Sequence, residues 1–193
     1  MAKIGILALQ GAFIEHEKML DKLNVEHFLI RKRSDLLQHM DGLILPGGES
    51  TAMGKLLDDL GLKEDIRSKI SNGLPVFGTC AGMILLGKDI EGSETKHLAC
   101  MDITVRRNAY GRQLGSFSTV SSFGNTPVQM VFIRAPYIGK AGDGVKIMST
   151  VDGNIVAAQQ NNMLVTAFHP ELTDDTTVHA YFINNIVIPN VSK

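Results

Sequence analysis

The stretch Leu74-Pro75-Val76-Phe77-Gly78-Thr79-Cys80-Ala81-Gly82-Met83-Ile84-Leu85-Leu86 places a cysteine between two short apolar runs. The first run is typical of a buried strand and the second of a helix, so residues 78–82 predict a sharp turn between them. Glycines on both sides of the cysteine leave room for such a tight backbone. At the apex, the Cys80 thiol would face the first turn of a helix, whose free N–H groups and positive dipole favour the thiolate. The stretch therefore predicts a nucleophile at the end of a strand.

Short apolar runs and helical patterns alternate through the first half of the chain, which predicts a parallel sheet with helices on both faces. Beyond residue 101, strand-like pieces are separated by Gly, Asn and Pro turns, which predicts a small antiparallel extension in the second half. We therefore expect a three-layer α/β fold in one domain, residues 1–193. The expected strands are 3–9, 26–30, 42–45, 75–77, 102–106, 128–133, 145–151, 154–160 and 164–168, and the expected helices are 12–23, 34–39, 51–60, 62–72, 81–86 and 175–188.

Composition narrows the class of protein. The 193 residues carry a net charge of −1 with no long run of one sign, so we expect no nucleic-acid partner and no anionic membrane surface. No apolar stretch approaches the length of a membrane span, and we expect a cytoplasmic protein. Cys80 and Cys100 are expected to be free thiols in a reducing compartment. No histidine lies at metal-ligand spacing from a cysteine, so we expect no metal.

A second reactive segment is Phe168-His169-Pro170-Glu171. Taken alone, a buried cysteine is often a small apolar residue, and a single histidine is often a hydrogen-bonded structural residue. Together, Cys80, His169 and Glu171 supply a nucleophile, a general base and a carboxylate to orient that base. The sequence therefore predicts a catalytic triad made of these three residues.

Paired glycines follow the expected strand 42–45 in Pro46-Gly47-Gly48-Glu49-Ser50. One interpretation is an ordinary strand-to-helix turn with Ser50 as the helix N-cap. In a parallel sheet, however, the carboxyl ends of the strands meet at one edge, so this loop, the segment at Gln10 and the two catalytic segments should lie together. We therefore expect the N–H groups of Gly48 and Ala81 to form an oxyanion hole.

These motifs, in this order, resemble those of class I glutamine amidotransferases of the triad type, which have a flavodoxin-like fold. The likeness extends over nearly the whole chain and is similar in detail to the glutaminase subunits of two-component pyridoxal 5′-phosphate synthases. The segments that carry it are Leu9-Gln10-Gly11-Ala12, Leu45-Pro46-Gly47-Gly48-Glu49-Ser50-Thr51, Phe77-Gly78-Thr79-Cys80-Ala81-Gly82, Arg107-Asn108-Ala109-Tyr110-Gly111-Arg112-Gln113, Phe132-Ile133-Arg134-Ala135-Pro136 and Phe168-His169-Pro170-Glu171-Leu172-Thr173.

The resemblance implies hydrolysis of L-glutamine to glutamate and ammonia, without a cofactor, and transfer of the ammonia to a lyase subunit in a hetero-oligomeric complex. It also implies a glutamine pocket in which the two arginines are candidates for the substrate carboxylate, although a surface arginine is commonly only solvated. Gln10 would cap a turn or touch the partner. The implied pocket residues are Gly47, Gly48, Glu49, Arg107, Ile133 and Arg134.

Two positions depart from the family pattern. Ile14 stands where relatives commonly carry a basic residue, and Gly54-Lys55 stands where they carry arginine. Neither is in the triad, so we expect the difference to affect contacts with the partner. Three other interpretations remain at this point: an amidotransferase subunit of another pathway such as imidazole glycerol phosphate synthesis, a non-enzymatic binding subunit, and a free-standing cysteine hydrolase.

Overall fold

The computed structural model describes residues 2–107 and 115–191. Its centre is a run of parallel strands in the order β2 (Glu26–Ile30), β1 (Lys3–Leu7), β3 (Gly42–Leu45), β4 (Val76–Thr79) and β12 (Met163–Thr166). Each of the first four strands was expected from the alternation in the sequence, and β12 brings the end of the chain back beside β4. The predicted parallel sheet is therefore confirmed.

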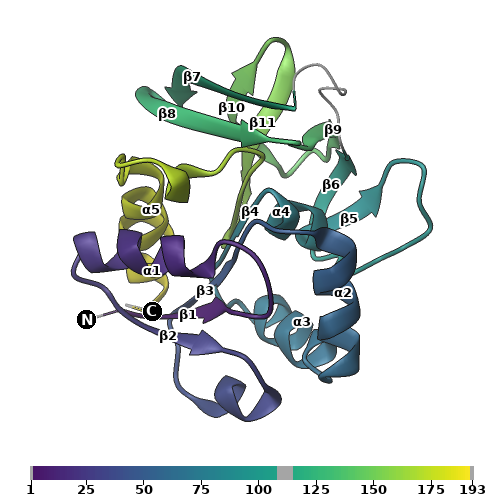
Figure 1. The fold of residues 1–193 in the computed structure, drawn as a ribbon, viewed down its shortest axis with the longest axis vertical. Coiled ribbons are helices and arrows are strands. Elements are labelled where there is room, and N and C mark those ends of the chain that lie inside the picture. The colour runs from purple at the N-terminus through teal and green to yellow at the C-terminus, as the bar shows by residue number, and fades with distance from the viewer. Residues whose placement is uncertain (1, 108–114, 192–193) are drawn as a thin grey trace.

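Helices cover both faces of this sheet (Figure 1). On one side lie α1 (Phe13–Lys22) and the C-terminal helical segment, which runs through α5 (Thr177–Tyr181), a π-helical stretch (Phe182–Val187) and α6 (Ile188–Val191). On the other lie α2 (Ser50–Asp59), α3 (Lys63–Ser71) and the short α4 (Ala81–Leu86). Two 3₁₀ turns, Arg33–Leu37 and Pro170–Leu172, complete the helical elements of the described chain.

The second half of the chain widens the sheet with mostly antiparallel strands. β11 (Asn154–Gln160) pairs antiparallel with β12, β10 (Lys146–Val151) and β9 (Tyr137–Ala141), and β9 pairs antiparallel with β6 (Met101–Arg106). The edge strand β5 (Gly87–Ile90) runs parallel to β6. The predicted antiparallel extension is confirmed, but β5 and β9 were not expected.

A separate hairpin, β7 (Ser116–Phe123) with β8 (Thr126–Ile133), lies across the end of the sheet near β10 (Figure 1). The rings of Phe117 and Phe132 stack at 4.5 Å between the strands, and Phe132 meets Phe168 edge-on at 5.8 Å. The sequence analysis missed β7 because polar residues, Thr119 and Ser121, stand at inward-facing positions, so the strand has no apolar run. The hairpin therefore packs against Phe168, the residue that precedes His169.

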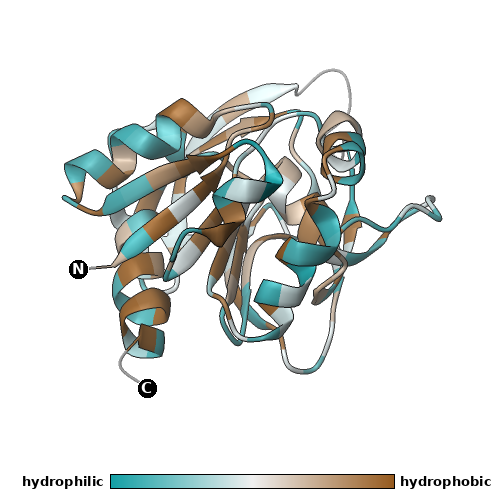
Figure 2. Ribbon diagram, turned by 90° about the horizontal axis from the view of Figure 1, so that it is seen from below, coloured by the Kyte–Doolittle hydropathy of each residue, from teal (hydrophilic) through white to brown (hydrophobic). Residues whose placement is uncertain are grey.

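The central strands are apolar because both their faces are buried. Figure 2 shows apolar residues, in brown, concentrated on the central strands. Phe77 on β4 is fully buried and contacts the rings of Phe182 and His179. This core fixes the strand ends, where the reactive segments begin.

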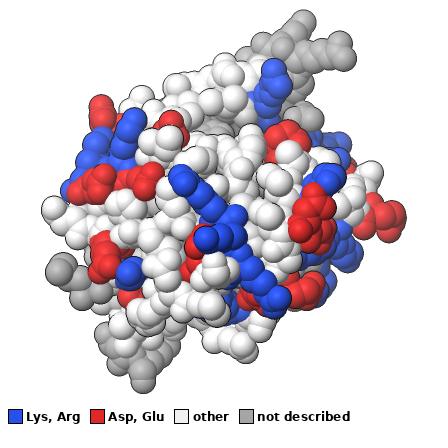
Figure 3. Space-filling model, turned by 60° about the horizontal axis from the view of Figure 1, so that its bottom comes forward, with Lys and Arg blue, Asp and Glu red and all other residues white. Residues whose placement is uncertain are grey.

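Acidic and basic side chains alternate over the face seen in Figure 3, without a large area of one sign. The helices of the described residues include none that is long and apolar enough to cross a membrane. In the same part of the chain, His, Cys, Asp and Glu side chains form no group of three or more that could hold a metal ion.

Candidate active site

Cys80 occupies the predicted elbow between β4 and α4. Its backbone has φ 49° and ψ −99°, a conformation that costs a non-glycine residue roughly 1–3 kcal/mol. A Cβ at Gly78 would lie 2.7 Å from the carbonyl carbon of Gly82, and a Cβ at Gly82 would lie 2.1 Å from the Leu45 carbonyl oxygen. The two glycines are therefore a steric requirement of the turn, as the sequence analysis expected.

The strand order brings the reactive segments together. Cys80 follows β4, and its N–H donates to the carbonyl of Thr166 at the end of β12 (2.8 Å), just before His169. On the other side of β4 is β3, which leads into Gly47, and next to β3 is β1, which leads into Gln10. The four segments thus meet at one edge of the sheet, because adjacent parallel strands end at the same level.

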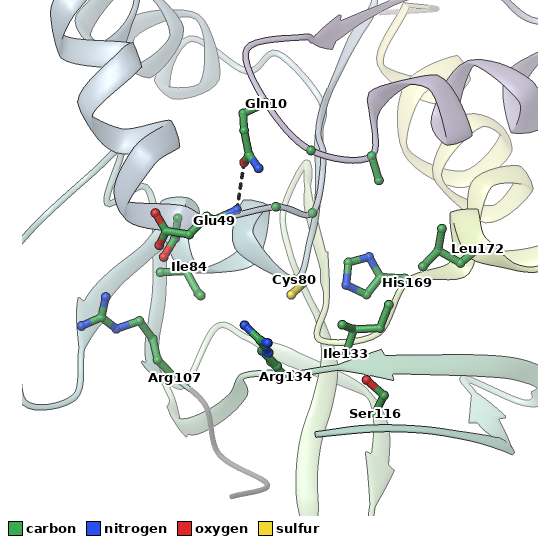
Figure 4. Close-up of a pocket in the computed structure, with 15 residues that line it drawn as sticks. Gln10, Glu49, Cys80, Ile84, Arg107, Ser116, Ile133, Arg134, His169 and Leu172 are labelled. Carbon is green, nitrogen blue, oxygen red and sulfur yellow. Dashed lines mark hydrogen bonds between the residues drawn. The ribbon is translucent and has the colours of Figure 1, made fainter. Parts of the chain in front are cut away.

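A cavity of about 720 Å³ opens at this edge, within the size range of small-molecule sites (Figure 4). Every substrate-pocket residue expected from the sequence lines it, as do Cys80 and His169. Several other residues line it without having been singled out. The lining residues are Gln10, Gly11, Ala12, Gly47, Gly48, Glu49, Ser50, Cys80, Ile84, Arg107, Ser116, Ile133, Arg134, His169 and Leu172.

His169 lies beside the thiol of Cys80 in the cavity (Figure 4), and Glu171 is on its other side. Its Nδ1 is 2.7 Å from Oε1 of Glu171, and both side chains are almost completely buried. Burial would lower the pKa of His169, but its hydrogen bonds to the side chains of Cys80 and Glu171 outweigh that effect and raise the pKa above its ordinary value. The imidazole of His169 therefore contacts the thiol of Cys80 on one side and the carboxylate of Glu171 on the other.

Burial likewise acts to raise the pKa of Glu171, yet the carboxyl group has a pKa below its ordinary value. The positive charges that His16 and His169 carry when they are protonated, together with the hydrogen bond from His169, cause this shift. Glu171 therefore carries its charge across the physiological pH range. An ionised carboxylate can hold Nδ1–H of His169 in place and leave Nε2 free to exchange a proton with Cys80.

The Gly47-Gly48 loop packs tightly between the side chains of His169 and Gln10. A Cβ at Gly47 would lie 2.3 Å from Cε1 of His169, and a Cβ at Gly48 would lie 2.4 Å from Oε1 of Gln10. The loop is tied to the segment after β1, because the Gly47 carbonyl accepts from the Ala12 N–H (2.9 Å). The backbone can approach the reactive groups this closely only because these residues lack side chains.

Gln10 holds the same loop through its side chain, whose Oε1 accepts from the Glu49 N–H at 2.9 Å (Figure 4). The sequence analysis left open whether Gln10 caps a turn or touches a partner, and within this chain it caps the loop.

Glu49, not Ser50, is the N-cap of α2. Its carboxylate accepts from the N–H groups of Thr51 (3.0 Å) and Ala52 (2.7 Å), and these bonds lower the pKa of Glu49. The alternative interpretation, in which Ser50 caps the helix, is wrong, because Ser50 is already the first helical residue and is buried. A cap of this kind stabilises a helix by about 1 kcal/mol. Glu49 therefore brings a fixed negative charge to the cavity.

The two candidate arginines reach the cavity from different sides (Figure 4). Arg107 follows β6, close enough to Glu49 for its charge to help lower the pKa of that carboxyl. Arg134 follows β8 with φ 44°, beside the half-exposed Ile133. The rest of the motif that begins at Arg107, residues 108–113, lies outside the described residues.

The positions that depart from the family pattern differ in their burial and contacts. Ile14, on the first turn of α1, is 51% exposed. Gly54 lies under the buried His97: a Cβ at this position would come within 2.2 Å of the His97 ring. Glycine at position 54 is thus needed for the close packing of His97 against α2, which the sequence analysis did not foresee. Lys55 pairs with Asp59 one turn further along α2.

A model of the SNO glutamine amidotransferase family matches residues 6–188. The chain belongs to this family. A curated relative of this amidotransferase, pyridoxal 5′-phosphate synthase subunit PdxT of Methanocorpusculum labreanum, is 59% identical over 189 residues, or 97% of this chain and 100% of the relative. A PdxT protein of Streptococcus pneumoniae is 58% identical over 186 residues, or 94% of this chain and 96% of the relative.

Solved structures agree with the fold of this amidotransferase. A crystal structure described as a glutamine amidotransferase superposes with a TM-score of 0.88 at 40% identity and covers 93% of this chain and 96% of its own. PurLQS from Thermotoga maritima shares the fold with a TM-score of 0.68 at 15% identity, over 96% of this chain and 99% of its own. The predicted family and the predicted fold class are both confirmed.

Proposed function

We propose that this amidotransferase hydrolyses L-glutamine to L-glutamate and ammonia through Cys80, His169 and Glu171, and that the ammonia is used by a separate synthase subunit to make pyridoxal 5′-phosphate. The observation that carries the proposal is the placement of His169, which hydrogen bonds to both Cys80 and Glu171 at the wall of a ligand-sized cavity. The family and the names of the curated relatives support the reaction and its use.

The chemistry follows from the order of these groups. His169 takes the proton of Cys80, and the thiolate attacks the side-chain amide carbon of glutamine. The tetrahedral oxyanion is held by the N–H groups of Gly48 and Ala81, at the two loops that flank the thiol. As the C–N bond breaks, His169 gives its proton to the departing ammonia. It then takes a proton from water, which attacks the thioester and releases glutamate and the free thiol.

The charges at the cavity wall favour an amino acid as ligand. Arg107 and Arg134 offer guanidinium groups to the substrate carboxylate, and a guanidinium can bind a carboxylate through two parallel hydrogen bonds. The ionised carboxylate of Glu49 offers an opposite charge to the substrate ammonium group. Gly47, Gly48 and Ile133 complete the wall against which the aliphatic part of glutamine packs.

The proposal assigns ammonia production to this chain and all later steps to the synthase subunit, and this assignment can be tested directly. Cys80→Ala, mixed with the synthase subunit, should make no pyridoxal 5′-phosphate from glutamine, because the nucleophile is gone. The same mixture supplied with an ammonium salt should make the coenzyme at close to the rate of the unmodified complex, because this chain contributes no group to the later steps. Synthesis from glutamine by the variant would overturn the role of Cys80. Failure of ammonium to restore synthesis, while the synthase alone uses it, would overturn the division of labour.

A free-standing cysteine hydrolase would use the same triad without a partner. The comparison of rates with and without the synthase, argued in the Discussion, separates this alternative from the proposal.

A further inference from the structure

Two fully buried histidines that the proposed chemistry does not use lie directly behind the triad. His16, on α1, places its Nδ1 2.9 Å from Nε2 of His179 on α5. On its other side, Nε2 of His16 is 3.2 Å from Oγ1 of Thr79, the residue before the nucleophile. Thr79 Oγ1 in turn donates to Oε1 of Glu171 at 3.3 Å. A continuous chain of hydrogen bonds thus leads from the C-terminal helix to the triad carboxylate.

The unpartnered atom at the far end fixes the direction of this chain. Nδ1 of His179 is buried and has no hydrogen-bond partner among the described residues. If Nδ1 carried the proton, a buried donor would be left unpaired, which costs more than an unpaired acceptor. The proton is therefore on Nε2 of His179, which donates to Nδ1 of His16. His16 then donates from Nε2 to Thr79, whose hydroxyl donates to Glu171.

All the donors consequently point toward the same carboxylate oxygen. Oε1 of Glu171 accepts from His169 at 2.7 Å and from Thr79 at 3.3 Å, with Nε2 of His16 3.6 Å away. Oε2 of Glu171 has no hydrogen-bond partner among the described residues. This chain of hydrogen bonds therefore determines which oxygen of Glu171 faces His169 and at what angle.

The two histidines supply donors without adding a competing positive charge. Burial lowers the pKa of both, so both are neutral at physiological pH. The titratable groups that face them are few: Glu171, His169 and Glu15 act on His16, and His16 and Glu171 act on His179. A charged His16 would neutralise Glu171 and weaken its hold on the imidazolium of His169.

We propose that His16 is a positioning residue of the glutaminase site, acting through Thr79 with support from His179 to orient Glu171 and, through it, His169. The inference rests on the proposed function. Simple core packing does not account for the arrangement: the ring of Phe77 meets both imidazoles edge-on, and apolar side chains could fill the same space without burying polar atoms. The polar atoms are arranged in one line that ends on the triad.

Matched pairs of variants separate positioning from packing. Thr79→Val keeps the shape of the side chain and removes the hydroxyl, whereas Thr79→Ser keeps the hydroxyl. His16→Phe fills the space without a donor, whereas His16→Gln can place an amide N–H near the position of Nε2. Ile70→Val, in the buried face of α3 and away from the cavity, controls for a general effect of core substitution. The melting temperature of each variant is measured alongside its activity.

With the synthase present, we expect Thr79→Val and His16→Phe to lower kcat for glutamine by about 10- to 100-fold while KM stays within about twofold. Thr79→Ser and His16→Gln should recover a large part of the loss. A second readout does not require turnover: the pH midpoint for alkylation of Cys80 by iodoacetamide should rise by about 0.5 unit or more in Thr79→Val and His16→Phe, because a poorly held His169 stabilises the thiolate less well.

Equal kcat and an equal alkylation midpoint in folded Thr79→Val and His16→Phe would overturn the inference. The inference would also be wrong if Thr79→Ser and His16→Gln lost as much activity as Thr79→Val and His16→Phe. It would likewise be wrong if the loss of activity simply followed the fall in melting temperature. In both cases packing alone would explain the effect. If the unmodified chain with its synthase releases no glutamate, the proposed function is wrong, and the alkylation midpoints still decide whether the buried histidines position His169.

Discussion

Gly47 packs against the imidazole of His169 so closely that a single Cβ at Gly47 would lie 2.3 Å from Cε1 of the ring. The position of the Gly47-Gly48 loop therefore depends on that of the His169 ring, and the reverse. Any side chain that fills this space must displace His169, and displacing a catalytic group by about 1 Å can lower a rate about 100-fold.

We accordingly expect Gly47→Ala to lower kcat for glutamine at least about tenfold with little change in melting temperature. Gly144→Ala is the matched control, since a Cβ there would meet only Gln160 Nε2, at an ordinary contact distance of 3.7 Å. Steady-state glutaminase rates with the synthase present provide the measurement. Equal loss of activity in both variants would contradict the steric coupling.

The two cysteines should differ sharply in reactivity. Burial raises the pKa of Cys100, whose thiol donates to the Leu98 carbonyl at 3.3 Å, and both effects favour the unreactive thiol. Cys80 sits beside His169 at the cavity wall. Limiting iodoacetamide at neutral pH should therefore label Cys80 first, as peptide mass spectrometry would show. Labelling of Cys100 ahead of Cys80 would count against a thiolate at the elbow.

Glu171→Gln should lower kcat by about 100- to 10,000-fold and leave KM for glutamine within about twofold. The amide keeps the shape of the side chain but lacks the charge that stabilises the imidazolium of His169 2.7 Å away. Glu64→Gln, on the exposed face of α3, is the control for charge removal. A defect confined to KM would reassign Glu171 to substrate binding.

The elbow and the convergence of the reactive segments could be predicted from the sequence because they depend on local rules. Glycine spacing around Cys80 specifies the turn, and alternating strands and helices specify which loops share an edge. By contrast, the hairpin strand β7 has only one side against the protein, so its pattern SFSTVSSF lacks the apolar run of a buried strand. The sequence analysis placed Glu49 in the pocket but did not predict that the same residue caps α2.

The buried histidine pair could not be foreseen at all. His16 and His179 are 163 residues apart, and each is a single polar residue on the inner face of a helix. The only local signal is a histidine on an otherwise apolar helix face. This signal does not show which other residue the histidine contacts. The contact arises when the sheet places α1 and α5 on the same side, so it is a property of the three-dimensional fold.

The same histidines should make the protein sensitive to mild acid. The folded state lowers the pKa of His179 to about 3 and also lowers those of His16 and His97, whereas histidine in the unfolded chain titrates near 6.5. Unfolding therefore takes up protons below about pH 6.5, and the free energy of unfolding falls as the pH falls.

We expect His179, whose pKa in the folded chain lies well below this range, to add roughly 1 kcal/mol per pH unit to this fall between about pH 6.5 and about pH 5. His179→Phe removes one of the groups, so urea unfolding of this variant should show a correspondingly shallower dependence on pH. Identical slopes for the two proteins would mean that His179 is not held neutral in the fold.

The isolated chain should be a poor glutaminase, and the synthase subunit should raise its rate. The Gly47-Gly48 loop is held by Gln10 through the Glu49 N–H, and paired glycines have several accessible backbone states. A partner that contacts this edge of the sheet can select the state that aims N–H groups at the oxyanion. Ile14, exposed on the first turn of α1 just after the Gln10 segment, is placed to take part in such a contact.

Glutamate release measured against increasing synthase concentration tests this directly. The unmodified chain should show a rate that rises and saturates. Ile14→Glu should need several-fold more synthase for half-maximal stimulation, with the same rate when alone, because a charge replaces an apolar contact. Leu37→Glu is the matched control, since Leu37 is even more exposed, at 87%, but precedes β3 and therefore lies toward the opposite edge of the sheet. A rate equal with and without synthase would identify a free-standing hydrolase, and equal shifts in both variants would remove Ile14 from the interface.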